Sequence, residues 1–106
     1  MPSSRWVVAA ELSSLPEAGK LAVYPKGLAT LLVRRGDELY AVANRCAHMA
    51  CPLDRGRLDG YVLECPCHDW RFDVRDGRLL DAPEISLPTF PVKIEGEHVL
   101  VELLGA

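Results

Sequence analysis

All four cysteines of the 106-residue chain, and two of its three histidines, fall within two short segments. The segments are Cys46-Ala47-His48-Met49-Ala50-Cys51 and Cys65-Pro66-Cys67-His68. Each supplies a thiolate and an imidazole within a few residues of each other. Such ligands suit a tetrahedral Zn²⁺ site, and they equally suit a 2Fe–2S cluster in which two histidines replace two cysteines on one iron. The two segments therefore predict a metal centre held between two loops.

The order of the ligands favours iron and sulfide over zinc. Zinc ribbons and fingers usually place like ligands two to four residues apart. Here His48 follows Cys46 and His68 follows Cys65, so each segment can give a thiolate to one iron and an imidazole to the other. A zinc-stabilised structural domain is the alternative, and it predicts bound metal without colour or acid-labile sulfide.

The composition is typical of one compact globular domain, which we expect to span residues 1–106. Hydrophobic residues make up 49% of the chain and charged residues 25%, which is not the composition of a disordered protein. The net charge of -3 argues against sequence-independent binding of nucleic acid, which needs a basic surface. The sequence has no bilayer-spanning apolar run and no secretion signal, so we expect a cytoplasmic protein without a membrane anchor.

The elements that must position the two segments are almost all short strands. They are rich in Val, Leu, Tyr and Trp, and Gly, Pro or Ser residues bound them. We expect strands at 5–10, 20–24, 27–34, 39–43, 60–64, 70–74, 78–80, 90–94 and 98–103. One helical turn is expected at 10–15, and residues 45–60 lack periodicity and indicate a structured loop. This pattern predicts an all-β sandwich or small barrel.

The last two expected strands show the clearest alternation of apolar and polar residues. It predicts a hairpin with one buried face, formed by Val92, Ile94, Val99, Val101 and Leu103. Loops carried by a rigid β framework of this kind are a common place for chemistry.

The two segments resemble the iron–sulfur motif of the Rieske family, and residues on both sides of them agree. The resemblance continues through Tyr40-Ala41-Val42, Pro52-Leu53, Gly56-Arg57-Leu58, Trp70-Arg71-Phe72-Asp73, Gly77, Leu87-Pro88 and Pro91-Val92. It covers essentially the whole chain. It implies an antiparallel Rieske-type β-sandwich or small barrel with an inserted cluster-binding subdomain of two loops at about 45–82.

The resemblance implies one bound Rieske-type 2Fe–2S cluster. Cys46 and Cys65 would bind the inner iron, and His48 and His68 the outer, solvent-facing iron. Two neutral imidazoles in place of two thiolates make the centre less negative, which raises its reduction potential above that of a four-cysteine centre.

Two further features of the resemblance concern the surroundings of the cluster. Cys51 and Cys67 match the cysteine pair that joins the two loops in Rieske proteins of cytochrome bc complexes, which implies a disulfide; two free thiols in a reducing cytoplasm are the alternative. Those proteins also place Ser and Tyr hydroxyls near the cluster sulfurs. This chain has Asp69-Trp70 and Phe72 there, the pattern of soluble Rieske ferredoxins, so we expect a potential of roughly -150 to +100 mV.

The function that the resemblance implies is one-electron transfer. A monomeric ferredoxin would take electrons from a reductase and pass them to an oxygenase or another oxidoreductase. Fully ligated irons leave no open coordination position, so we expect no catalysis by the chain alone. The alternative is a small Rieske subunit of a multi-subunit oxidoreductase such as NAD(P)H nitrite reductase. We exclude a Rieske oxygenase large subunit, because outside the two segments His98 is the one histidine left for its second iron.

Overall fold

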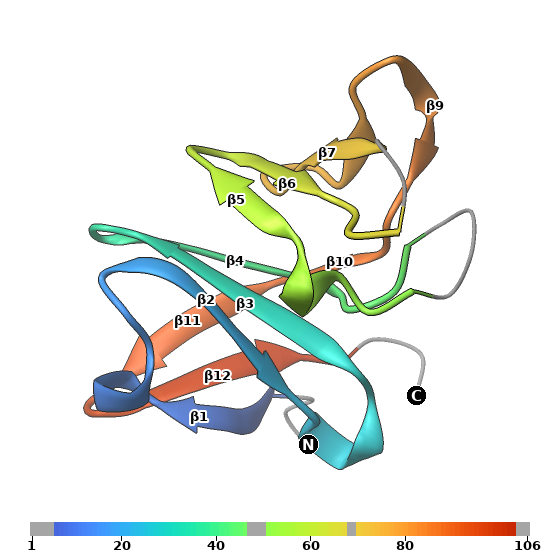
Figure 1. The fold of residues 1–106 in the computed structure, drawn as a ribbon. Helices are drawn as coiled ribbons and strands as arrows, with labels where there is room; N and C mark the ends of the chain where they lie inside the picture. The colour runs from blue at the N-terminus through green and yellow to red at the C-terminus, as the bar shows by residue number, and fades with distance from the viewer. Residues whose placement is uncertain (1–5, 47–50, 68–69, 104–106) are drawn as a thin grey trace.

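The computed structural model describes residues 6–46, 51–67 and 70–103. Within these ranges the chain forms twelve strands and three short 3-10 helices, and the strands make three antiparallel sheets (Figure 1). The predicted all-β class is therefore confirmed. No helix among the described residues is long and apolar enough to cross a membrane.

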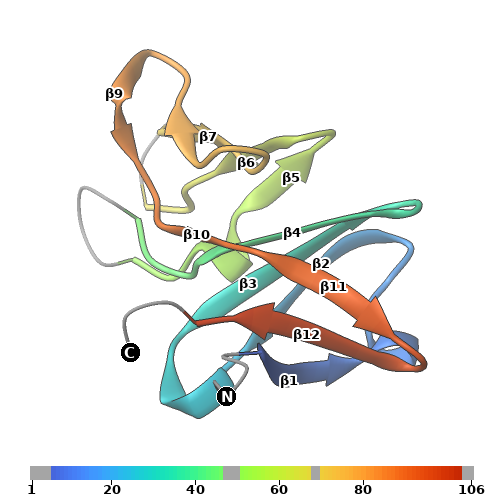
Figure 2. The ribbon, with the colours of Figure 1, turned by 180° about the vertical axis from the view of Figure 1, so that it is seen from behind.

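Two of the sheets form one half of the molecule, which we call the base. The first sheet has the order β1-β12-β11 and the second the order β10-β4-β3-β2. Their strands are β1 (Trp6–Glu11), β2 (Ala18–Val23), β3 (Thr30–Arg35), β4 (Glu38–Ala43), β10 (Thr89–Phe90), β11 (Val92–Glu95) and β12 (His98–Glu102). The two sheets lie against each other (Figures 1 and 2), and the core between them contains Leu32, Val99 and Val101.

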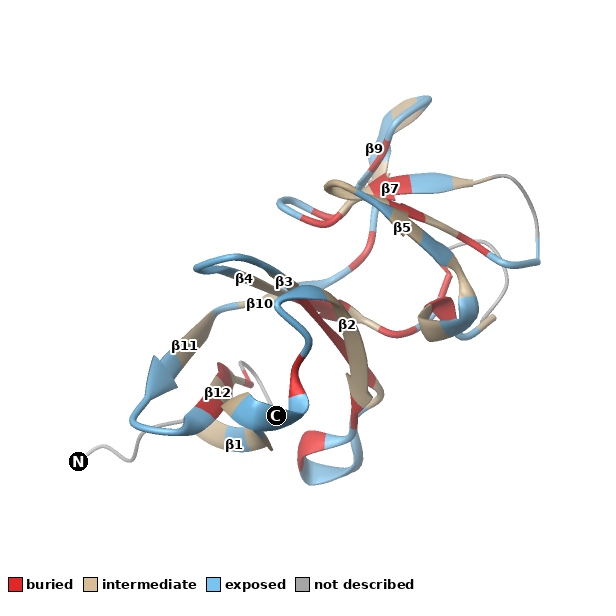
Figure 3. Ribbon diagram, turned by 60° about the vertical axis from the view of Figure 1, so that its left-hand side comes forward, coloured by how far each residue is buried: buried red, intermediate tan, exposed pale blue. Residues whose placement is uncertain are grey.

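The third sheet, with the order β5-β6-β7-β8-β9, forms the other half, which we call the lobe. Its strands are β5 (Arg57–Asp59), β6 (Val62–Glu64), β7 (Arg71–Asp73), β8 (Arg78–Leu79) and β9 (Ala82–Ser86). Successive residues of a strand point to opposite faces, so Leu32 of β3 joins the base core while its neighbour Leu31 joins Leu63 and Phe72 in the lobe core. Buried residues accordingly follow β3 and the inner side of the lobe (Figure 3).

Pro91 divides the strand that the sequence predicts at 90–94. β10, before it, pairs with β4 of the second sheet, whereas β11, after it, pairs with β12 of the first sheet. Proline has no N–H to donate to a strand ladder, so the β10–β4 pairing ends before it. The Pro91 carbonyl accepts the N–H of Glu102 in β12. The chain therefore passes from one sheet to the other at this residue (Figure 2).

Two expectations about the base need correction. The strand expected at 27–34 begins at Thr30, because Lys26 and Gly27 take positive φ angles of 54° and 81° in the turn η2 (Pro25–Gly27). Ile94, expected on the buried face of the last hairpin, is 41% exposed, since it lies near the turn of an edge strand. The helical turn expected at 10–15 is present as η1 (Leu12–Ser14).

The lobe is more regular than the sequence predicted. The expected loop at 45–60 contains a helical turn, η3 (Leu53–Arg55), and the strand β5. The strand β9 was also not predicted. These segments are short, and each has too few apolar residues to show the alternation of a half-buried strand.

Candidate metal centre

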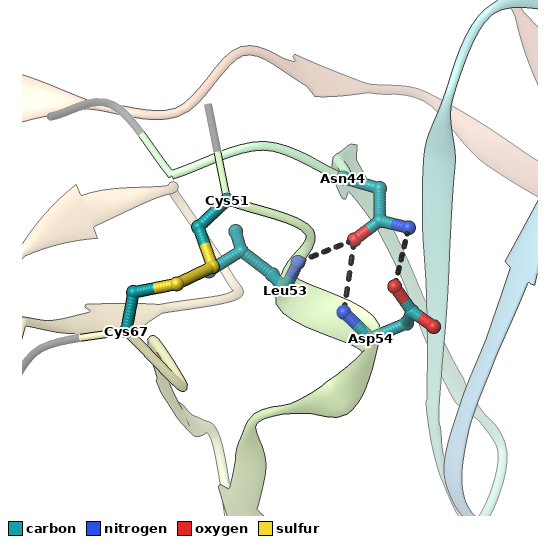
Figure 4. The surroundings of a disulfide bond; sticks show 5 residues. All are labelled: Asn44, Cys51, Leu53, Asp54 and Cys67. Carbon is teal, nitrogen blue, oxygen red and sulfur yellow. Dashed lines mark hydrogen bonds between the residues drawn. A yellow bond between two sulfur atoms is a disulfide. The ribbon is translucent and has the colours of Figure 1, made fainter. Parts of the chain in front are cut away.

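The described parts of the two cysteine-containing segments lie side by side at one end of the lobe (Figure 1). We call residues 46–51 loop one and residues 65–70 loop two. Cys51 and Cys67, sixteen positions apart in the sequence, are joined by a disulfide with a Cα–Cα distance of 6.5 Å (Figure 4). The structure thus contains the cross-link that the resemblance implied.

Cys46 and Cys65 lie outside this disulfide and are deeply buried. Their exposed fractions are 4% and 2%, and both belong to the lobe core. The Cys65 sulfur lies within 4.8 Å of the sulfurs of Cys51 and Cys67. Because the last two sulfurs are bonded to each other, they are not thiolate ligands. Among the described residues the structure therefore brings the Cys65 thiol next to the cross-link that ties the loops together.

The two loops are closed in the same way by backbone hydrogen bonds. The N–H of Cys46 donates to the carbonyl of Cys51 at 2.9 Å, and the N–H of Cys65 donates to the carbonyl of Trp70 at 2.8 Å. In each loop the cysteine that we expect to bind iron donates to the residue five positions later. His48 and His68 lie outside the described residues, so their place within these two closures stays a prediction.

Loop one is followed by the helical turn η3, which a buried side chain holds in place. Asn44 Oδ1 accepts the N–H groups of Leu53 and Asp54, at 2.7 and 2.9 Å. Asn44 Nδ2 donates to Asp54 Oδ1 at 3.0 Å. Figure 4 shows these contacts beside the disulfide. No sequence pattern marks Asn44, because its partners lie about ten positions away along the chain.

Gly56 lets the chain that leaves loop one pass close to β6. A Cβ atom at this position would lie 1.8 Å from the Glu64 carbonyl oxygen, far inside van der Waals contact. Glu64 directly precedes Cys65, so this close approach brings the end of loop one to the start of loop two.

Two aromatic residues, Trp70 and Phe72, come shortly after the expected ligand His68 in the sequence. Trp70 and Phe72 contact each other edge to face, with ring centroids 6.3 Å apart, and Phe72 is fully buried. Neither side chain carries a hydroxyl group. The expected potential, in the lower to middle part of the range for histidine-ligated centres, stays a prediction.

A cluster of polar side chains, which we call the polar group, links the lobe to the base at the end of the lobe away from the two loops. Arg75 lies 4.3 Å from the centroid of the Tyr61 ring, and the Tyr61 hydroxyl donates to Glu38 at the β3–β4 turn. The hydrogen bond to Glu38 raises the pKa of Tyr61, and burial together with Glu38 raises the pKa of Tyr40. This group links the lobe and the base away from the two loops.

Within the lobe, the same arginine forms an ion pair. Arg75 contacts the Asp73 carboxylate at 2.8 Å, and this hydrogen bond lowers the pKa of Asp73. Sequence analysis missed the whole polar group, because the residues look like ordinary turn and surface positions when the fold is not known.

The donor set fits a metal centre with soft ligands. Cys46 and Cys65 are buried among apolar side chains, in two loops that are closed alike and cross-linked. A buried thiolate needs a positive partner, because burial alone disfavours the charged form. A metal ion bound between the loops would supply that charge.

Comparison with known proteins shows which family this fold resembles. Residues 5–91 match the model of the Rieske [2Fe-2S] domain. The ferredoxin component of the naphthalene 1,2-dioxygenase system of Pseudomonas aeruginosa is 40% identical over 102 residues, which are 95% of this chain and 98% of that protein. The ferredoxin of carbazole 1,9a-dioxygenase from Nocardioides aromaticivorans IC177 matches with a TM-score of 0.83 and 33% identity, over 93% of this chain and 97% of that one.

A third similar structure is a complex of reduced oxygenase and oxidised ferredoxin in carbazole 1,9a-dioxygenase. The matching chain has a TM-score of 0.83 and 29% identity, and the match covers 94% of both chains. The similarity to ferredoxins therefore holds in sequence and in three-dimensional structure.

Proposed function

This chain belongs to the Rieske [2Fe-2S] domain family, and from that membership we propose that Cys46, His48, Cys65 and His68 bind its 2Fe–2S cluster. The family binds a cluster of this type, and the chain is an electron carrier rather than an enzyme, as its ferredoxin relatives are. When bound, a 2Fe–2S cluster takes up and returns one electron at a time. The burial of Cys46 and Cys65 supports their assignment to the inner iron.

The protein's own residues have separate tasks in this proposal. Cys46 and Cys65 supply negative sulfur ligands from within the lobe core, and the disulfide between Cys51 and Cys67 keeps the two loops together. Phe72 and its apolar neighbours exclude water from the inner side of the site. His48 and His68 would supply neutral nitrogen ligands on the outer side, where a redox partner can approach.

The partners follow from the relatives. The proposed role is to carry electrons from a reductase to the terminal oxygenase of an aromatic-ring dioxygenase system. The observation that carries this proposal is the 40% identity to a dioxygenase ferredoxin component over 95% of the chain. The structure of an oxygenase–ferredoxin complex supports direct contact between such partners. A small subunit of a nitrite reductase is the alternative, and no described feature of the chain favours it.

The proposal includes a monomeric cytoplasmic carrier formed by a single domain at 1–106, with the cluster-binding subdomain at about 45–82. The lobe sheet, whose strands extend from Arg57 to Ser86, supports a subdomain in this part of the chain. Cell fractionation tests the location, and size-exclusion chromatography tests the oligomeric state. A protein that co-purifies in fixed ratio with a larger reductase would instead support the small-subunit alternative.

Reconstituted turnover tests the proposed partners. The purified protein would be added to the reductase and the terminal oxygenase of a naphthalene dioxygenase system, with NADH and naphthalene. We expect dihydroxylated product to form in proportion to the added protein, and none when it is omitted or when Cys46→Ser replaces it. Reduction of the protein by the reductase without product formation would contradict the oxygenase as acceptor.

A further inference from the structure

Asn44 is one of two polar residues that are buried in the described part of the chain, the other being Thr30. Its exposed fraction is 4%. It lies two positions before Cys46, at the point where β4 ends and loop one begins. A buried polar side chain is stable only when its hydrogen bonds are made, and those of Asn44 go to residues on the far side of loop one.

The contacts of Asn44 replace a missing helix cap. The first N–H groups of a helical turn have no partner within the turn and are usually satisfied by a side chain at the N-cap. The N-cap of η3 is Pro52, which makes no side-chain cap hydrogen bond. Asn44 Oδ1 accepts the N–H groups of Leu53 and Asp54 instead (Figure 4). A residue before loop one thus caps the turn that follows it.

The capped turn is in turn fixed to the base. Asn44 donates its own backbone N–H to the Ala29 carbonyl at 3.1 Å, beside β3. The Asp54 carbonyl accepts a hydrogen bond from the Lys20 ammonium group on β2. The Leu53 side chain is fully buried in the lobe core. Both ends of loop one are therefore held by contacts that do not involve the disulfide, which ties loop two to loop one.

We propose that Asn44 is a positioning residue for the metal centre, because it joins the two described ends of loop one and so fixes the backbone that carries Cys46. The inference rests on the proposed function, since Cys46 is a cluster ligand only within it. Asn44 itself touches no ligand group in this proposal; it acts through the N–H groups of Leu53 and Asp54 and through the Asp54 carboxylate.

A reciprocal exchange of Asn44 and Asp54 separates positioning from simple filling of space. Asn44→Asp keeps the size and the accepting oxygen, but it loses the donor to Asp54 and places two carboxylates about 3.0 Å apart. Asp54→Asn alone keeps an acceptor for the Asn44 amide. In the double variant Asn44→Asp/Asp54→Asn, the new amide can donate to the new carboxylate. The contact is then restored with its direction reversed and with no change in net charge.

Thr30→Val is the matched control. Thr30 is also buried, and its hydroxyl makes one hydrogen bond to the Leu28 carbonyl at 3.0 Å, within the base. The substitution removes a buried hydrogen bond at nearly constant volume, and it removes none of the side-chain hydrogen bonds between Asn44 and residues 53 and 54. It shows how much any loss of a buried hydrogen bond changes the measured quantities.

Two measurements on the protein as purified would report on loop one. Hydrogen–deuterium exchange of peptides that cover residues 51–56 follows the N–H groups that Asn44 caps. The EPR line shape after reduction follows the ligand geometry. In Asn44→Asp we expect the N–H groups of residues 53 and 54 to exchange about tenfold faster or more, because repulsion between the two carboxylates weakens the cap and it opens more often. We also expect a changed EPR line shape. The double variant should exchange at a rate within about twofold of the wild type and should recover the wild-type line shape. Thr30→Val should change neither the exchange rate nor the line shape.

Each other outcome contradicts the inference. Wild-type exchange and line shape in Asn44→Asp would show that Asn44 does not position the loop. A perturbation that the double variant fails to restore would assign the effect to the buried charge at position 44 and not to the lost hydrogen bond. If Asn44→Asp does not fold, a double variant with wild-type spectra still supports the inference, and one that also fails overturns it. A wild-type protein without iron and sulfide would overturn the proposed function as well, which distinguishes that failure from the others.

Discussion

The disulfide between Cys51 and Cys67 gives a quantitative prediction. The cross-linked residues are sixteen positions apart, and in the chain-entropy model a loop of this length stabilises the fold by about 3 kcal/mol. This value is an upper limit for the loaded protein, because the proposed ligands Cys46 and Cys65 close nearly the same stretch of chain. We therefore expect Cys51→Ser and Cys67→Ser each to lower the free energy of unfolding by about 1–3 kcal/mol.

A double-mutant cycle makes this prediction specific to the bond. Either substitution alone breaks the disulfide, so the variant Cys51→Ser/Cys67→Ser should lose no more than one of the single variants, and the coupling energy should equal the whole effect. Urea unfolding followed by circular dichroism, with the visible absorbance of the cluster recorded in parallel, measures all four proteins. When the urea titration is repeated with a reductant present, the free energy of unfolding should fall for the wild type and stay unchanged for the three variants.

Two results would refute the reasoning about the disulfide. One is a double variant that loses the sum of the two single losses, since each sulfur would then contribute through its own packing. The other is a wild type as stable as the double variant under non-reducing conditions. That result would mean that the cross-link does not form in the purified protein or does not stabilise it.

Three further predictions concern the loop contacts, the acid limb and the potential. Gly56→Ala should prevent stable assembly, because its Cβ would overlap the Glu64 carbonyl oxygen. Gly19→Ala should have a smaller effect, because its Cβ would lie 3.1 Å from the Pro16 side chain, which can shift slightly; iron content and thermal unfolding compare the two variants. The lowered pKa of Asp73 stabilises the fold at pH values above the ordinary pKa of 3.8, and this contribution is lost as the pH falls through the lowered pKa. Asp73→Asn should therefore weaken the dependence of the unfolding free energy on pH in this acidic range, and an unchanged dependence would refute the argument. The wild-type potential should lie between roughly -150 and +100 mV, and His68→Cys should lower it if the cluster assembles; an electrochemical titration that finds a rise would contradict the charge argument.

The framework could be predicted from the sequence where one strand carries enough apolar residues. The run Leu31-Leu32-Val33 and the alternation through Val99 and Val101 mark β3 and β12. All five of these residues are buried, as expected for Val99 and Val101. The split at Pro91 could have been anticipated from its missing N–H, but which sheet each half joins depends on tertiary pairing. Ile94 has the right spacing and is exposed nonetheless, because it lies near the turn of an edge strand.

The residue types of the site could be predicted from the sequence, but the contacts that hold its two loops in place could not. Cysteines and histidines in two short segments identify a metal centre without any fold, and the resemblance supplied the pairing of Cys51 with Cys67 that the structure contains. The supports of the loops depend on contacts between distant residues. Nothing in the local sequence marks Asn44 as the cap of a turn about ten positions later, or Gly56 as the point of closest approach to β6.

Pulsed EPR of the dithionite-reduced protein tests the ligand set most directly. We predict two irons and two sulfides per chain, with nitrogen hyperfine couplings from two histidines. Substitution of His48 or His68 by cysteine should remove one coupling at a time wherever the cluster still assembles. A colourless protein with one zinc ion, or a reduced cluster without nitrogen coupling, would contradict the assignment of Cys46, His48, Cys65 and His68 as the ligands.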